Sequence, residues 1–265
     1  AKRQSSLTLD KVRLDTINFR LTQRDSHLSF GGQVRNNKKN PDFVFNALFD
    51  GVVQERGATF GVRYYDVAER LGVRLGAQVE MVDEGIRLHL VPSRPTIGYK
   101  EVNLNDDNYI LLAADKRIQT KIDLVADDGT GLKVYSEDSN PSALQDITVS
   151  LNKLNLAEVT STLPYVPRMT GLLNGDYHVV KESDGHFSIV SEMAVRQMTY
   201  EGSPIGNVGT ELIYMQKEGD AHAVEARLMK DDEEVGVLAG TYYNNKEGEG
   251  SIDATLQMAR LPLSL

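Results

Sequence analysis

The sequence predicts an all-β protein: an elongated, strongly curved, trough-like sheet of roughly a dozen to sixteen strands with one short helix near residues 155–163. Three observations support this prediction. Apolar and polar residues alternate along most of the 265 residues, clusters of Gly, Asn and Asp interrupt the alternation at short intervals, and a single segment has helical spacing. Because successive side chains of a strand point to opposite faces, such a sheet has one apolar and one polar face.

Residues 71–81 show the alternation most clearly. Their odd positions are apolar and their even positions are Gly, Arg, Gln and Glu. Residues 82–85 supply turn chemistry, and the alternation then resumes at Ile86, Leu88 and Leu90, which predicts a hairpin. Similar turn sequences separate alternating runs at residues 127–131, 182–185 and 244–248.

Residues 155–163 break the alternation and predict a short amphipathic helix. Asn155 is followed three residues later by Glu158, which resembles a capping box, and Pro164 prevents continuation. The apolar residues follow the spacing i, i+3, i+7 and are Leu156, Val159 and Leu163.

The chain reads as one continuous, repetitive sheet segment over residues 1–265. It contains no linker rich in Pro, Gly and Ser. Leu151 aligns with Leu256 and Leu156 with Leu261, so repeat boundaries are expected near residues 150 and 255, with a second helix beginning after the last strand. The chain starts without Met and ends in an apolar stretch, and we expect it to be cut from a longer protein.

Composition excludes several classes of function. Lys and Arg number 29 against 38 Asp and Glu, giving a net charge of −9, so we expect no nucleic-acid partner. The absence of cysteine excludes disulfides and thiolate nucleophiles. No apolar run is long enough to predict a membrane-spanning helix.

Catalytic and metal-binding motifs give no support to an enzyme. The closest match to a Gly-x-Ser-x-Gly motif, residues 202–206, contains a proline in a predicted turn. The five histidines lack ligand spacing, and the acidic clusters at 105–108, 127–128 and 231–234 lack the spacing of a calcium loop. We therefore expect a non-enzymatic protein without metal or cofactor. A carbohydrate-active enzyme is disfavoured because Trp, which often stacks on sugars, is absent.

An open sheet with one apolar face must cover that face. A second sheet, closure into a barrel, or curling into a trough that holds a ligand would each do so. Composition alone favours a closed sandwich, so a β-sandwich binding or adhesive module of the cell envelope remains the alternative.

Several segments together resemble a recurrent unit of the AsmA-like superfamily, especially its TamB-type envelope proteins from Bacteroidetes-like bacteria. In this unit a short helix ends at Pro, and two Gly four residues apart open a long alternating strand. The matching segments are residues 149–152, 154–159, 163–164, 169–179 and 206–212.

The resemblance implies a segment of a periplasm-spanning, lipid-transfer conduit that supports phospholipid transport to the outer membrane and assembly of that membrane. The full-length protein would be anchored in the inner membrane of a Gram-negative bacterium. It would bind phospholipid acyl chains in an apolar groove and contact a barrel-type outer-membrane partner through regions outside this segment.

The cleanest apolar alternators are the predicted lining of that groove, and a plain packed core is the competing interpretation of each. A register shift of one residue would move such a side chain to the polar face. The predicted groove residues are Val73, Leu75, Val79, Leu88, Leu90, Ile122, Leu124, Val149, Leu151, Phe187, Ile189, Ile252 and Leu256.

Overall fold

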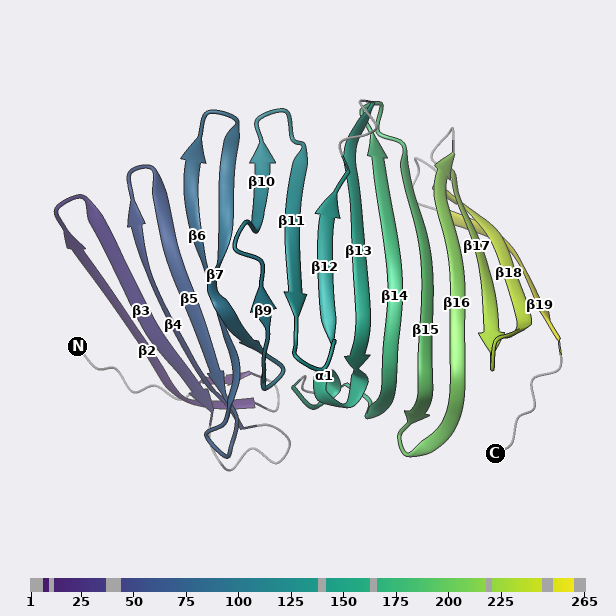
Figure 1. The fold of residues 1–265 in the computed structure, drawn as a ribbon, viewed down its shortest axis with the longest axis horizontal. Helices are drawn as coiled ribbons and strands as arrows, with labels where there is room; N and C mark the ends of the chain where they lie inside the picture. The colour runs from purple at the N-terminus through teal and green to yellow at the C-terminus, as the bar shows by residue number, and fades with distance from the viewer. Residues whose placement is uncertain are drawn as a thin grey trace.

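A computed structural model shows one open antiparallel sheet of 19 strands and one short helix (Figure 1). The described part of the chain comprises residues 7–9, 12–36, 44–137, 142–162, 166–217, 221–244 and 250–259. Within these residues the sheet does not close into a barrel, and it forms one layer rather than the two packed sheets of a sandwich. The all-β prediction is confirmed.

The sheet is a meander in which strands pair with their neighbours along the chain. The first half contains β1 (Leu7–Leu9), β2 (Val12–Arg24), β3 (His27–Asn36), β4 (Asn46–Gln54), β5 (Gly57–Tyr65), β6 (Leu71–Val82) and β7 (Gly85–Ile97). The second half contains β11 (Ile118–Val125), β12 (Gly131–Ser136), β13 (Ala143–Asn155), β14 (Met169–Glu182), β15 (Phe187–Tyr200), β16 (Ser203–Lys217), β17 (Ala221–Lys230), β18 (Glu233–Asn244) and β19 (Gly250–Met258). The colour gradient of Figure 1 accordingly runs from one end of the sheet to the other.

Three short strands replace a regular strand between β7 and β11. They are β8 (Lys100–Glu101), β9 (Asn103–Leu104) and β10 (Tyr109–Ala113). β8 pairs with β7, and β9 pairs with β11. β10 pairs with β7 on one side and with β11 on the other. Two-residue strands show no periodicity, which is one reason why the sheet has 19 strands rather than a dozen to sixteen.

The predicted helix is confirmed as α1 (Leu156–Thr162), which packs against β13 and β14. Asn155 is its N-cap: the side-chain Oδ1 accepts a hydrogen bond from the backbone N–H of Ala157 at 3.0 Å. The Asn155 side chain also donates to Glu158 Oε1 at 3.1 Å, so the two residues of the predicted capping box contact each other. The second predicted helix, after residue 258, lies outside the described residues.

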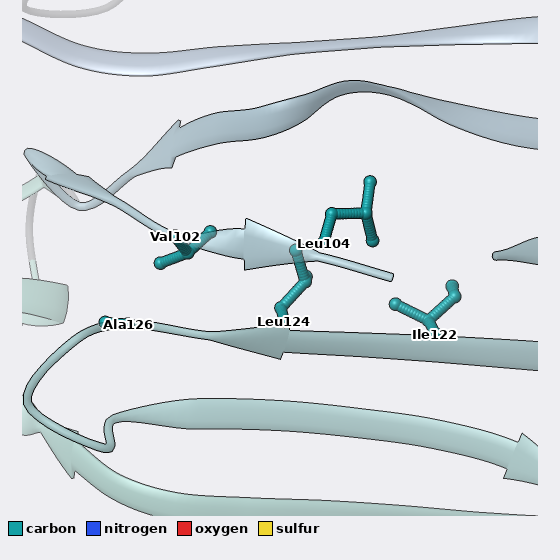
Figure 2. Packing of buried hydrophobic residues seen from close by; sticks show 5 residues of the cluster. All are labelled: Val102, Leu104, Ile122, Leu124 and Ala126. Carbon is teal, nitrogen blue, oxygen red and sulfur yellow. The ribbon is translucent and has the colours of Figure 1, made fainter. Parts of the chain in front are cut away.

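A small packed core lies in the middle of the sheet, where β9 meets β11 (Figure 2). Leu104 pairs directly with Leu124, and both are less than a tenth exposed. Substantial contacts between described elements otherwise join neighbouring strands, or α1 with β13 and β14. The buried cluster consists of Val102, Leu104, Ile122, Leu124 and Ala126.

Candidate functional site

Cross-strand register shows which side chains share a face, because directly paired residues of antiparallel strands point the same way. Val79 pairs with Leu88, which also pairs with Ile110, and this connection continues strand by strand to Ile252 and Leu256 on β19. All the predicted groove residues lie on this one side of the sheet. We call it the apolar face, and it carries Val73, Leu75, Val79, Leu88, Leu90, Ile122, Leu124, Val149, Leu151, Phe187, Ile189, Ile252 and Leu256.

Exposure varies strongly along the apolar face. Ile122 and Leu124 belong to the packed cluster and are 8% and 7% exposed. Ile252 and Leu256, at the C-terminal end of the sheet, are 74% and 57% exposed. The other predicted groove residues are half-buried. Among the predicted groove residues, exposure is therefore lowest in the packed cluster and highest at the C-terminal end of the sheet.

Phenylalanines cover the apolar face at its N-terminal end. Phe19 on β2 and Phe49 on β4 have ring centroids 6.4 Å apart. Gly32 lies between them on β3 and pairs with both. Phe19 is 63% exposed, so this aromatic surface is open to solvent. The same period-two pattern that identified the aliphatic residues could have identified these rings.

An aromatic row crosses the apolar face at its C-terminal end. Phe187 on β15 contacts the ring of Tyr214 on β16 at a centroid distance of 5.8 Å. The Tyr214 hydroxyl lies 2.6 Å from His222 Nδ1, and the two rings stack. His222 in turn lies 6.0 Å from the ring of Tyr242. The sequence reasoning named only Phe187 of this row.

A shallow apolar hollow of about 450 Å³ adjoins the aromatic row. Tyr214, His222 and Tyr242 line one part of it. Aliphatic side chains, including Val224, Leu238 and Ile252, line the rest. The row thus places two hydroxyl groups and one imidazole beside an otherwise hydrocarbon surface.

A charged network holds helix α1 near β8 and the turn between β11 and β12. Lys100 Nζ lies 2.9 Å from Asp128 Oδ2 and 3.0 Å from Glu158 Oε2. Hydrogen bonds to these carboxylates raise the pKa of Lys100, and the bond from Lys100 lowers the pKa of Asp128. Lys100 on β8 pairs across the strands with Ile97 on β7, which lies on the apolar face. The network therefore lies at the rim of the apolar face.

The opposite side of the sheet, which we call the polar face, carries ion pairs between neighbouring strands. Arg63 on β5 lies 3.1 Å from Asp50 on β4. Lys133 on β12 lies 3.1 Å from Asp123 on β11. Each of these residues directly follows an apolar-face residue of its strand (Phe49, Val62, Ile122 or Leu132), so charge and hydrocarbon are separated between the two faces here.

The histidines do not converge on a metal site. His178 Nε2 lies 2.7 Å from Asp146 Oδ1, whereas His186 contacts Asp184 in the β14–β15 turn. Among the described residues no group of three His, Asp or Glu side chains is placed to hold a metal ion. Within the same residues, no helix combines the length and hydropathy needed to cross a bilayer.

The apolar face, with its aromatic side chains at each end, is therefore the candidate binding surface. Comparison of the chain with protein-family models, with curated proteins and with solved structures finds no match.

Proposed function

We propose that the apolar face binds phospholipid acyl chains and that the chain serves as a section of a lipid-transfer conduit in a Gram-negative envelope. The observation that supports this function best is the shared face of all the clean alternators from β6 to β19. A periplasmic location, a barrel-type outer-membrane partner and a TamB-type origin belong to the same proposal. No catalytic activity is part of it.

The size of the apolar face suits a transfer surface better than a single-ligand pocket. Neighbouring strands are about 4.8 Å apart, and β8, β9 and β10 together take one position in the sheet, so the eleven steps from β6 to β19 span roughly 50 Å. That distance exceeds the length of one acyl chain. Several lipids could therefore lie along the sheet in succession.

The energetics are compatible with movement along this face. Each buried CH₂ contributes roughly 0.8 kcal/mol, so partial burial of two acyl chains contributes on the order of 10 kcal/mol. A bilayer gives acyl chains a similar environment, so transfer between the two has a small net cost. Between the two aromatic ends the predicted groove residues are aliphatic, and these side chains give one lipid no polar anchor at which to stop.

Photo-crosslinking tests this function directly. A photoreactive amino acid at position 75 or 149 should label phospholipid in vesicles or cells. The same amino acid at Arg74 or Ser150 should not, because these neighbours point to the polar face. Equal labelling at inward and outward positions would contradict the proposal.

A transport assay supplies the functional counterpart. Val149→Arg should block lipid transport because it places a charge on the half-buried hydrocarbon surface. Arg74→Ala, on the polar face, should leave transport intact. Urea denaturation of both variants shows whether each is folded. A loss of transport supports a lipid-binding groove only in a variant that remains folded.

A further inference from the structure

The polar face carries a second apolar patch on β15–β18, on the side of the sheet away from the proposed lipid surface. Val190 pairs with Ile213, and Met215 pairs with Ala223. Val190, Ile213 and Met215 are 50%, 43% and 42% exposed. We define the β15–β18 patch as Val190, Ile213, Met215, Ala223 and Ala239.

This patch breaks the separation of charge and hydrocarbon seen elsewhere. On β16, Leu212 and Tyr214 point to the apolar face while Ile213 and Met215 point away from it. The alternation is lost there because both faces are apolar. The surface is also hollowed, with a depression of about 400 Å³ between Ile213, Met215 and Ala239.

Carboxylates surround the β15–β18 patch. Asp176, Glu192 and Glu211 pair directly in consecutive steps across β14, β15 and β16. Glu225 lies between Ile213 and Ala239 in the next cross-strand row. Like charges directly opposite each other destabilise a sheet, so this arrangement opposes folding of the free protein.

Two cations lie near this charge: Lys217, which lines the depression beside Met215, and Arg227. Arg227 pairs with Glu211 and lies 3.6 Å from its carboxylate, and it also lies 3.9 Å from Glu234. Within the part of the chain that the structure describes, Asp176, Glu192, Glu225 and Asp253 form no ion pair. The carboxylates outnumber the two cations, so the patch combines exposed hydrocarbon with an excess of negative charge.

We infer that the β15–β18 patch docks a basic amphipathic helix of a partner protein. Aliphatic side chains of the helix pack on the patch, and its Lys or Arg side chains reach the surrounding carboxylates. The strands under the patch are already paired on both sides, so a partner cannot add a strand there. A helix satisfies its own backbone hydrogen bonds and can lie across the face.

The dimensions set the length of the helix. Crossing from Val190 on β15 to the flanking carboxylate Asp253 on β19 takes four steps of about 4.8 Å, or roughly 20 Å. At 1.5 Å per residue this corresponds to a helix of about 13 residues. Its apolar residues would follow the spacing i, i+3, i+4, i+7, with basic residues beside them.

A designed peptide tests charge and hydrocarbon together. The probe is a fluorescent 14-residue amphipathic Leu/Lys peptide, and the control is the same peptide with Glu in place of Lys. We expect the Lys peptide to bind the whole chain by fluorescence anisotropy and the Glu peptide not to bind. The double variant Glu192→Gln/Glu225→Gln should weaken binding by roughly three- to tenfold.

A matched variant controls for total charge. Asp83→Asn/Glu84→Gln removes two exposed carboxylates from the β6–β7 turn, far along the sheet from β15. It should bind the Lys peptide like the unmodified protein. Equal weakening by both double variants would overturn the proposal, because the effect would then reflect net charge alone.

Crosslinking assigns the bound peptide to a face. A photoreactive residue at Ile213 should label the Lys peptide, and one at the neighbouring Leu212 should not, because the two point to opposite faces. Predominant labelling at 212 would overturn the proposal. With phospholipid vesicles in place of the peptide, we expect the photoreactive residue at 212 to label lipid and the one at 213 not to. Failure of the helix-docking proposal and failure of the lipid-binding proposal therefore give different results.

The remaining outcome concerns self-association. If the chain forms a dimer in analytical ultracentrifugation and Ile213→Lys abolishes it, the patch is an interface between copies and the proposed partner is wrong. We expect Ile213→Lys to remain folded, to leave the mass in solution unchanged, and to lose binding of the Lys peptide.

Discussion

Gly32 provides space for an aromatic ring on the apolar face. A Cβ at this position would meet the Phe49 ring and would lie 2.5 Å from the backbone oxygen of Asn18. Backbone cannot move aside as a flexible side chain can. The glycine therefore permits Phe19 and Phe49 to approach each other across β3.

Gly32→Ala should accordingly lower the free energy of unfolding by about 1–3 kcal/mol through overpacking. Gly31→Ala is the matched control, since a Cβ there would lie 3.5 Å from the nearest atom, the backbone oxygen of Phe49. Urea denaturation measures both variants. Similar losses for the two would show that the ring contact is not the cause.

Tyr64 gives a prediction that depends on pH. Burial raises the pKa of Tyr64 to about 12, and the nearby Tyr99 contributes to the shift. In the unfolded chain a tyrosine ionises near pH 10. Between about pH 10 and 12 the folded state holds one more proton than the unfolded state, so stability falls as pH rises through this window.

Tyr64→Phe should make this alkaline loss of stability less steep while keeping the ring that stacks on Phe45. Unfolding in urea at pH 9, 10, 11 and 12 measures the slope. Absorbance at 295 nm gives an independent check, because the difference between the two proteins should titrate near pH 12. A difference that titrates near pH 10 would contradict the assignment.

For single residues, the sequence predicts the face of the sheet to which a side chain points but not the exposed fraction of that side chain. The alternation is enough to place Ile122 and Ile252 on one face. It cannot show that Ile122 is 8% exposed and Ile252 is 74% exposed. Exposure depends on β9, a two-residue strand without a recognisable pattern, whose Leu104 packs in the same cluster as Ile122.

Helix α1 depends on its cap because a helix of seven residues has little intrinsic stability. Asn155→Ala removes the acceptor for the Ala157 N–H and should lower the free energy of unfolding by about 1 kcal/mol. Hydrogen exchange should accelerate at the amides of α1 more than at those of β14.

Asn155→Asp distinguishes the two roles of the side chain. The aspartate keeps an acceptor for the Ala157 N–H but cannot donate to Glu158. It also places a second carboxylate beside that of Glu158. Stability close to the unmodified protein would show that the cap dominates. A loss equal to that of Asn155→Ala would instead assign the stabilisation to the Glu158 contact.

Elements with strong periodicity were predictable, and those formed by irregular backbone were not. The helix over 155–163 and the hairpin around residues 82–85 follow from local spacing. The stretch from Gly98 to Leu104 does not, because positive φ angles at Gly98 and Tyr99 redirect the chain between β7 and the two-residue strand β8. A bulge between Leu151 and Leu154 likewise shifts the register with β14 without a signal in the pattern.

Across the whole sheet, the apolar face has a small packed cluster near its middle and an open C-terminal end. The central cluster is sealed by β9 beside β11, whereas β19 pairs only with β18 in the described part of the chain. A closed sandwich would instead bury every apolar alternator to a similar degree. The contrast between the packed cluster and the C-terminal end therefore offers a test of the architecture itself.

Leu256→Lys and Leu124→Lys should behave differently for this reason. Leu256 is 57% exposed, so its lysine remains hydrated, and we expect stability within about 0.5 kcal/mol of the unmodified protein. Leu124 is 7% exposed, and burying an unpaired ammonium there should cost more than about 4 kcal/mol or prevent folding. Circular dichroism and urea denaturation measure both. If Leu256→Lys also unfolds the protein, a second layer covers the C-terminal end of the apolar face, and that surface is not available to lipid.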